Sequence, residues 1–209
     1  MEIEMKYLVR DRAQADEILN DEIVKSVEDE GSFETIDMYA VYYDTPDRKL
    51  TEAGIAVRVR REGEFYVATM KDKGNSIEGM HKRKEINVRL SDEKMIREPD
   101  VTIFSESDAY EQLLGIAGKG KLVPVLSMIF ERRQVRVDTG DAISMLSFDD
   151  GEIKAGSKTL PIMEMEIELY SGDVDALKEY GTKIAEKFGL TAEDRSKFAR
   201  GYALIVLVK

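Results

Sequence analysis

Charged and apolar residues alternate along much of the chain, which is the period-two pattern of β-strands that bury one face. In other segments the apolar residues recur every three or four positions, as they do on one face of a helix. Because the predicted strands mostly follow one another, we expect an antiparallel sheet with added helices, the α+β class. The strands are predicted at 2–10, 41–43, 55–61, 65–71, 83–90, 125–138, 143–149 and 162–170. The helices are predicted at 12–30, 106–116, 173–188 and from Thr191 onward.

Local signals refine these expectations. Asp173 is a candidate N-cap for the helix that follows it, and Asp194 would complete a capping pair with Thr191. His81 lies in a segment rich in glycine and charge, so we expect a solvent-exposed loop residue there. The chain shows no linker-like or low-complexity stretch, and one domain over 1–209 is predicted.

Composition excludes several kinds of chemistry. The chain has no cysteine and one histidine, which excludes disulfides, thiolate sites, a cysteine nucleophile and a multi-histidine metal site. Its net charge of −11 makes it a poor general binder of nucleic acid, because phosphate backbones demand a positive surface. No apolar run is long enough to span a bilayer, and the first residues do not resemble a secretion signal, so we expect a cytoplasmic protein with no membrane partner.

Full charges of one sign recur two or four residues apart on the same face of the predicted strands. The pairs and the triplet are Glu2/Glu4, Arg58/Arg60, Arg132/Arg136 and Glu164/Glu166/Glu168. A solvated sheet face is the ordinary interpretation of polar alternation. Like charges that recur so closely are better explained by a counter-charge, which is a hard divalent cation for carboxylates and a phosphate for arginines. A barrel with these charges inside and apolar faces outside, covered by helices, would place both around one cavity.

Seven segments of the chain occur in the order of the motifs of a known family. They are Glu2-Ile3-Glu4-Met5-Lys6, Tyr42-Tyr43-Asp44-Thr45, Gly54 to Arg60, Thr69-Met70-Lys71, Arg83-Lys84-Glu85, Glu166-Ile167-Glu168-Leu169 and Ser196 to Gly201. On these segments the chain resembles the CYTH proteins, also called triphosphate tunnel metalloenzymes. The resemblance implies an eight-stranded antiparallel β-barrel, open as a tunnel with a charged interior and flanked by helices.

The resemblance also implies roles for individual residues. One or two Mg²⁺ or Mn²⁺ ions would be held by Glu2, Glu4, Asp149, Glu166 and Glu168. The triphosphate would be bound by Lys6, Arg58, Arg60, Lys71, Arg83, Arg132, Arg136 and Lys197. Catalysis would fall to Glu4, Glu168 and Lys6. Arg132 is preferred to Arg133 because it shares strand parity with Arg136. Glu85 is expected to pair with a cation, whereas Glu164 is left open between an ion pair and a metal ligand.

The implied activity is metal-dependent hydrolysis of inorganic triphosphate or a small organic triphosphate. An adenylate cyclase of the same superfamily and a thiamine triphosphatase are alternatives with the same triphosphate site. A non-catalytic module that binds polyphosphate or a nucleotide is the alternative from a different class. The expected partner is a small molecule that contains a triphosphate, and whether the chain forms a homodimer is left open.

Overall fold

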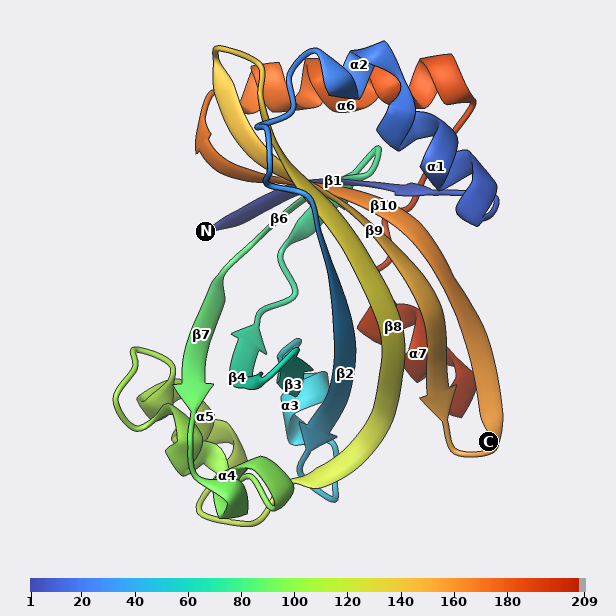
Figure 1. The fold of residues 1–209 in the computed structure, drawn as a ribbon. Helices are drawn as coiled ribbons and strands as arrows, with labels where there is room; N and C mark the ends of the chain where they lie inside the picture. Colours follow the sequence, from blue (N-terminus) through green and yellow to red (C-terminus); the bar gives the residue numbers. More distant parts are fainter. Residues whose placement is uncertain (207–209) are drawn as a thin grey trace.

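One strongly curled antiparallel sheet organises the protein, as the computed structural model of residues 1–206 shows (Figure 1). Residues 207–209, the end of the domain predicted over 1–209, lie outside the described part. The strand order is β5-β6-β1-β10-β9-β8-β2-β3-β4-β7, and β11 lies beside β1. The strands are β1 (Glu2–Leu8), β2 (Glu34–Asp44), β3 (Ala56–Glu62), β4 (Phe65–Lys71), β5 (Asn75–Ile77), β6 (Met80–Arg83), β7 (Glu85–Leu90), β8 (Val123–Asp138), β9 (Ala142–Ala155), β10 (Lys158–Gly172) and β11 (Thr191–Ala192).

A single stretch of chain joins the two ends of this sheet. Only Lys84 separates β6 from β7, yet β6 pairs with β1 and β7 pairs with β4. The sheet therefore curls until residues 80–90 bridge its two sides. The predicted α+β class is confirmed, and the predicted antiparallel β-barrel is a curled half-barrel in the structure. The strand count rises from the eight expected to eleven. The strand expected over 83–90 begins earlier and is divided at Lys84 into β6 and β7, and the short β5 and β11 are added.

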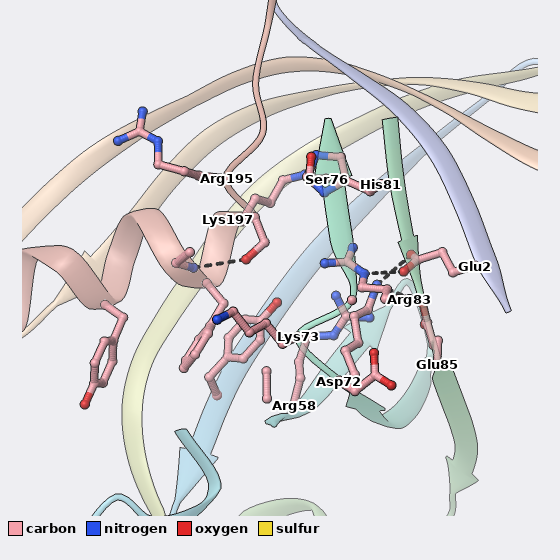
Figure 2. Close-up of a pocket in the computed structure, with 18 of the residues that line it drawn as sticks. Glu2, Arg58, Asp72, Lys73, Ser76, His81, Arg83, Glu85, Arg195 and Lys197 are labelled. Carbon is pink, nitrogen blue, oxygen red and sulfur yellow. Dashed lines mark hydrogen bonds and ion pairs between the residues drawn. The ribbon is translucent and has the colours of Figure 1, made fainter. Parts of the chain in front are cut away.

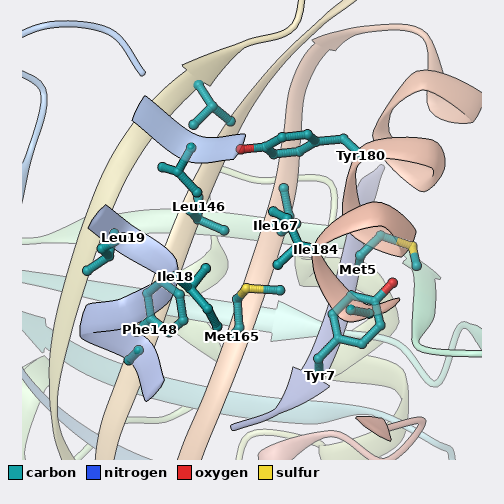
Figure 3. Close-up of a cluster of buried hydrophobic side chains, with 14 of the residues drawn as sticks. Met5, Tyr7, Ile18, Leu19, Leu146, Phe148, Met165, Ile167, Tyr180 and Ile184 are labelled. Carbon is teal, nitrogen blue, oxygen red and sulfur yellow. The ribbon is translucent and has the colours of Figure 1, made fainter. Parts of the chain in front are cut away.

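The outer face of the sheet is apolar, as the alternation predicts. Met5 of β1, Phe148 of β9 and Ile167 of β10 are buried there under three helices. These helices are α1 (Arg12–Asn20), α2 (Glu22–Lys25) and α6 (Val174–Phe188). Figure 3 shows Ile18 of α1 and Ile184 of α6 packed into this cluster. Since strand side chains alternate between faces, burial of this apolar set directs the neighbouring charges inward.

A second cluster covers the outer side of β3 and β4. Val57 and Met70 are buried there together with Phe104 and Leu113. The covering elements are α3 (Lys49–Glu52), α4 (Glu93–Arg97), the 3₁₀ helix at Val101–Phe104 and α5 (Tyr110–Ala117). Both clusters are contributed by the outward positions, so they leave the concave face for other residues.

The last helix, α7 (Lys197–Val206), lies inside the curl of the sheet (Figure 1). Its Phe198 stacks on Tyr42 of β2 with ring centroids 4.9 Å apart, and Phe198 also faces Tyr202 at 5.6 Å. Met128 and Phe130 of β8 belong to the same cluster. The helix therefore fills one part of the interior with apolar contacts, and its first residue, Lys197, lies where the charged part begins.

Two predicted helices differ from the structure for local reasons. The helix expected over 12–30 is divided at Asp21, which has extended backbone angles and accepts a hydrogen bond from the backbone N–H of Ile23 to cap α2. The helix expected from Thr191 begins instead at Lys197, because Thr191–Ala192 pairs with β1. The predicted cap is confirmed at Asp173, which accepts from the backbone of Asp175 and Ala176.

No helix among residues 1–206 combines the length and the apolar character that a membrane crossing requires.

Candidate active site

A cavity of about 910 Å³ opens inside the curled sheet, and most of the predicted site residues line it (Figure 2). Figure 2 shows Glu2 joined to Arg83 on one side, while Lys197 extends from the start of α7. Asp149 lies beneath the cavity wall with 1% of its surface exposed. The predicted residues that line the cavity are Glu2, Glu4, Lys6, Arg58, Arg60, Lys71, Arg83, Arg132, Glu166, Glu168 and Lys197.

Four carboxylates gather near the cavity space, and we call them the outer group: Glu2, Glu4, Glu85 and Glu168. Strand pairing explains part of this, since Glu4 of β1 lies directly opposite Glu168 of β10. Lys71 contacts Glu2 at 2.7 Å and Glu85 at 2.8 Å. Arg83 contacts both Glu2 and Glu4, the latter at 3.2 Å. Lys71 and Arg83 thus contact three of the four carboxylates.

Glu168 is the member of the outer group with no ion pair among residues 1–206. Its side chain is reached from solvent through the cavity, yet the surrounding walls remove part of its hydration. This loss of hydration, helped by the negative charges of Glu2 and Glu4, raises the pKa of Glu168 to about 7. Glu168 therefore lacks a cation among residues 1–206 that compensates its negative charge.

Three further carboxylates, the inner group, lie deeper: Asp149, Glu164 and Glu166. Their nearest oxygens lie within 4.8 Å of one another. Arg132 binds both oxygens of Asp149 at 2.7 Å and one oxygen of Glu166 at 2.6 Å. The Lys197 ammonium lies 2.6 Å from Asp149 and 2.9 Å from Glu166, and it also contacts Glu164. Arg200 of α7 pairs with the other oxygen of Glu164.

The two groups differ in charge balance. Three cations (Arg132, Lys197 and Arg200) match the three inner carboxylates. The outer group carries an excess of negative charge, because its four carboxylates contact Lys71, Arg83 and a Lys6 that is shared with the inner group. Lys6 lies between the groups, 3.2 Å from Glu4 and 3.0 Å from Glu166. Burial lowers the pKa of Lys6, but Glu4, Glu166 and Glu164 outweigh it and hold that pKa above its ordinary value.

Arg58 of β3 contributes a cationic group that is free of ion pairs among residues 1–206. Arg58 donates to the Thr69 hydroxyl at 3.2 Å and forms no ion pair among residues 1–206, and its buried Nε has no hydrogen-bond partner. Thr69 in turn donates to Asn87 at 2.8 Å, which fixes its orientation. Arg60 lies two residues further on and donates to Glu62 at 2.7 Å. An unpaired guanidinium buried in this way fits an anionic ligand.

Comparison with known proteins places this site in a family. The family profile of the CYTH domain matches residues 1–202. The chain belongs to the CYTH family.

This CYTH chain is 31% identical over 163 residues to an inorganic triphosphatase of Haemophilus influenzae. The match covers 78% of this chain but 44% of the relative, so the chain spans less than half of that protein's length.

Solved structures share the CYTH fold at low identity. One is a putative adenylyl cyclase from Hippeastrum, described as having a dominant triphosphatase activity, at 17% identity and a TM-score of 0.70 over 97% of this chain and 96% of that one. A putative adenylate cyclase of Bacillus halodurans gives 18% identity and a TM-score of 0.59 over 96% of both chains. A protein of Pyrococcus horikoshii gives 23% identity and a TM-score of 0.58 over the full length of both. These likenesses concern the fold alone.

One predicted phosphate ligand of the CYTH site lies elsewhere. Arg136 is not among the lining residues, its side chain is 54% exposed, and it pairs with Asp29. Arg136 lies on the same face of β8 as Arg132. However, β8 is 16 residues long and continues beyond the cavity, so a position on the right face does not ensure that the side chain reaches the cavity. Glu85 pairs with Lys71, as predicted.

His81 was predicted in a solvated loop, and that prediction is wrong. It lies in β6, opposite Glu4, and 5% of its surface is exposed. Its Nε2 lies 2.9 Å from the backbone carbonyl of Glu193. The neighbouring Asp194 accepts from Ser76 at 2.9 Å and from the backbone of Gly79 at 2.8 Å. These contacts connect the segment before α7 to the β5–β6 hairpin. In the sequence, the two-residue spacing of His81 and Arg83 was the signal that could have indicated a strand here.

Proposed function

We propose that this chain hydrolyses inorganic triphosphate or a small organic triphosphate with the aid of Mg²⁺ or Mn²⁺. The observation that carries the proposal is the separation of charge within one cavity. Glu2, Glu4 and Glu168 lie on β1 and β10 with excess negative charge, while Arg58 and Arg60 present positive charge from β3. A divalent cation and a triphosphate would each supply the charge that one side lacks.

The outer group fits a hard cation better than the inner group does. Carboxylate oxygens are the ligands that Mg²⁺ and Mn²⁺ prefer. Loss of hydration, followed by the negative charges of Glu2 and Glu4, raises the pKa of Glu168, and a bound cation would offset both effects. Asp149 and Glu166, also predicted as ligands, already receive Arg132 and Lys197. We therefore assign the cation first to Glu2, Glu4 and Glu168. When bound, the cation would neutralise phosphate charge and lower the pKa of the water that it holds.

The chain's own residues would orient the triphosphate and move a proton. Arg58 and Arg60 are placed to donate to phosphate oxygens, while Lys6 and Arg83 stand at the border with the carboxylates. Held in line by these donors, the triphosphate would present its terminal phosphorus to water. Glu168, which lies on the acidic side of the same cavity, would accept the proton of that water.

An aromatic wall favours a second substrate candidate. Tyr42, Phe198 and Tyr202 line the same cavity beside the charged part. A planar group attached to the triphosphate would stack there, which favours ATP or thiamine triphosphate over the inorganic compound. With ATP, attack by a ribose hydroxyl would yield the cyclase outcome.

A phosphate-release assay distinguishes these functions. The protein is incubated with inorganic triphosphate, ATP or thiamine triphosphate, with Mg²⁺, with Mn²⁺ or with EDTA. We expect phosphate release that requires a metal and is lost in EDTA. Cyclic AMP and pyrophosphate from ATP would instead establish the cyclase. Tight binding of every triphosphate without turnover would contradict an enzyme and favour the binding module.

A further inference from the structure

We propose that Arg200 is a positioning residue that offsets the buried charge of Glu164 and so limits the negative charge that a triphosphate meets beside Lys197. The inference rests on the proposed function, since it concerns how that site holds its phosphate-binding charge. Neither Arg200 nor Glu164 lines the cavity, so neither touches a ligand there. Their action has to pass through a residue that does, and Lys197 is in contact with Glu164.

The geometry connects the three residues through one helix face. Lys197 and Arg200 are three positions apart in α7, so their side chains leave the helix on the same side. Both reach Glu164 of β10, Lys197 at one carboxylate oxygen and Arg200 at the other. Glu164 is fully buried and Arg200 is 7% exposed, so water does little to screen this contact.

The charge balance of the inner group depends on Arg200. With it, Asp149, Glu164 and Glu166 are matched by three cations. Without it, the unpaired charge of Glu164 would draw on Lys197 and Lys6, which lies 3.9 Å from Glu164. The floor of the cavity would then carry one more negative charge where a triphosphate has to bind.

An ion pair that only holds α7 against β10 would look similar in the structure but would respond differently to substitution. Such a pair is lost when either partner is removed, and removing both does not restore it. If Arg200 instead compensates the charge of Glu164, neutralising Glu164 makes Arg200 unnecessary, so the double variant recovers. The KM for inorganic triphosphate therefore separates the two roles, whereas thermal stability does not.

The test compares Arg200→Gln, Glu164→Gln and the double variant in the metal-dependent assay. We expect Arg200→Gln to raise KM about tenfold, which corresponds to one nearby uncompensated charge. We expect Glu164→Gln not to raise KM, and the double variant to return within about threefold of the unsubstituted protein. A double variant that keeps the raised KM of Arg200→Gln would overturn the proposal.

Controls keep the result interpretable. Arg133→Gln removes a guanidinium on the opposite face of β8, 6% exposed and paired with Asp16, and should leave KM unchanged. If Arg200→Gln does not fold, Glu164→Gln decides alone, because an increase in KM there contradicts charge compensation. If the unsubstituted protein shows no turnover, the proposed hydrolysis has failed. The same variants are then compared by their Kd for inorganic triphosphate in titration calorimetry, with the same expected order.

Discussion

Glu4→Gln should abolish metal-dependent triphosphate turnover while leaving the fold intact. Glu4 lies opposite Glu168 and faces the part of the cavity that carries excess negative charge. The substitution keeps the shape of the side chain but removes the charge that a divalent cation needs. Loss of metal assistance is worth several kcal/mol of barrier, so we expect kcat to fall at least about a hundredfold.

The measurement is phosphate release from inorganic triphosphate at saturating Mg²⁺ or Mn²⁺, with thermal unfolding followed in parallel. Glu152→Gln is the matched control, because Glu152 is an exposed glutamate of β9 outside the cavity lining. The control should keep its activity. A Glu4→Gln protein that turns over at the normal rate with the normal metal dependence would refute the role of the outer group.

Arg58→Ala should weaken triphosphate binding much more than it changes the fold. The side chain donates to Thr69, lies over the ring of Tyr42 and forms no ion pair within the described residues, so no ionic contact of the fold depends on it. A charge-assisted hydrogen bond contributes about 1.5–3 kcal/mol, which predicts an increase of roughly 10- to 150-fold in the Kd for triphosphate.

Titration calorimetry with inorganic triphosphate measures this change directly. Arg61→Ala is the natural comparison, because Arg61 lies in the same strand, β3, and is exposed. The Arg61 variant should bind like the unsubstituted protein. Equal affinities in all three proteins would mean that the triphosphate does not meet Arg58.

The division of charged and apolar faces was predictable because strand side chains alternate with a fixed period. Once Met5 and Ile167 are buried on the outer face, Glu4 and Glu166 have to point inward. The same argument places Arg58 and Arg132 at the cavity. None of this requires knowledge of distant contacts, which is why the sequence was sufficient.

Features that depend on distant contacts were not predictable in this way. Arg136 has the right parity, but only the curvature of the sheet decides how much of β8 lies along the cavity. His81 and the start of α7 depend on pairing between β1, β6 and the segment before α7, which are far apart in sequence. The pairing of Arg200 with Glu164 depends on α7 lying inside the curl.

The location of a bound metal tests the central claim, which is that the cavity separates an acidic cation site from a basic phosphate site. The measurement is a crystal structure with Mn²⁺ and inorganic triphosphate, in which anomalous scattering identifies the metal. We predict the metal beside Glu2, Glu4 and Glu168, with the triphosphate extending toward Arg58 and Arg60. A metal bound only among Asp149, Glu164 and Glu166, or a triphosphate held outside the cavity, would contradict the account.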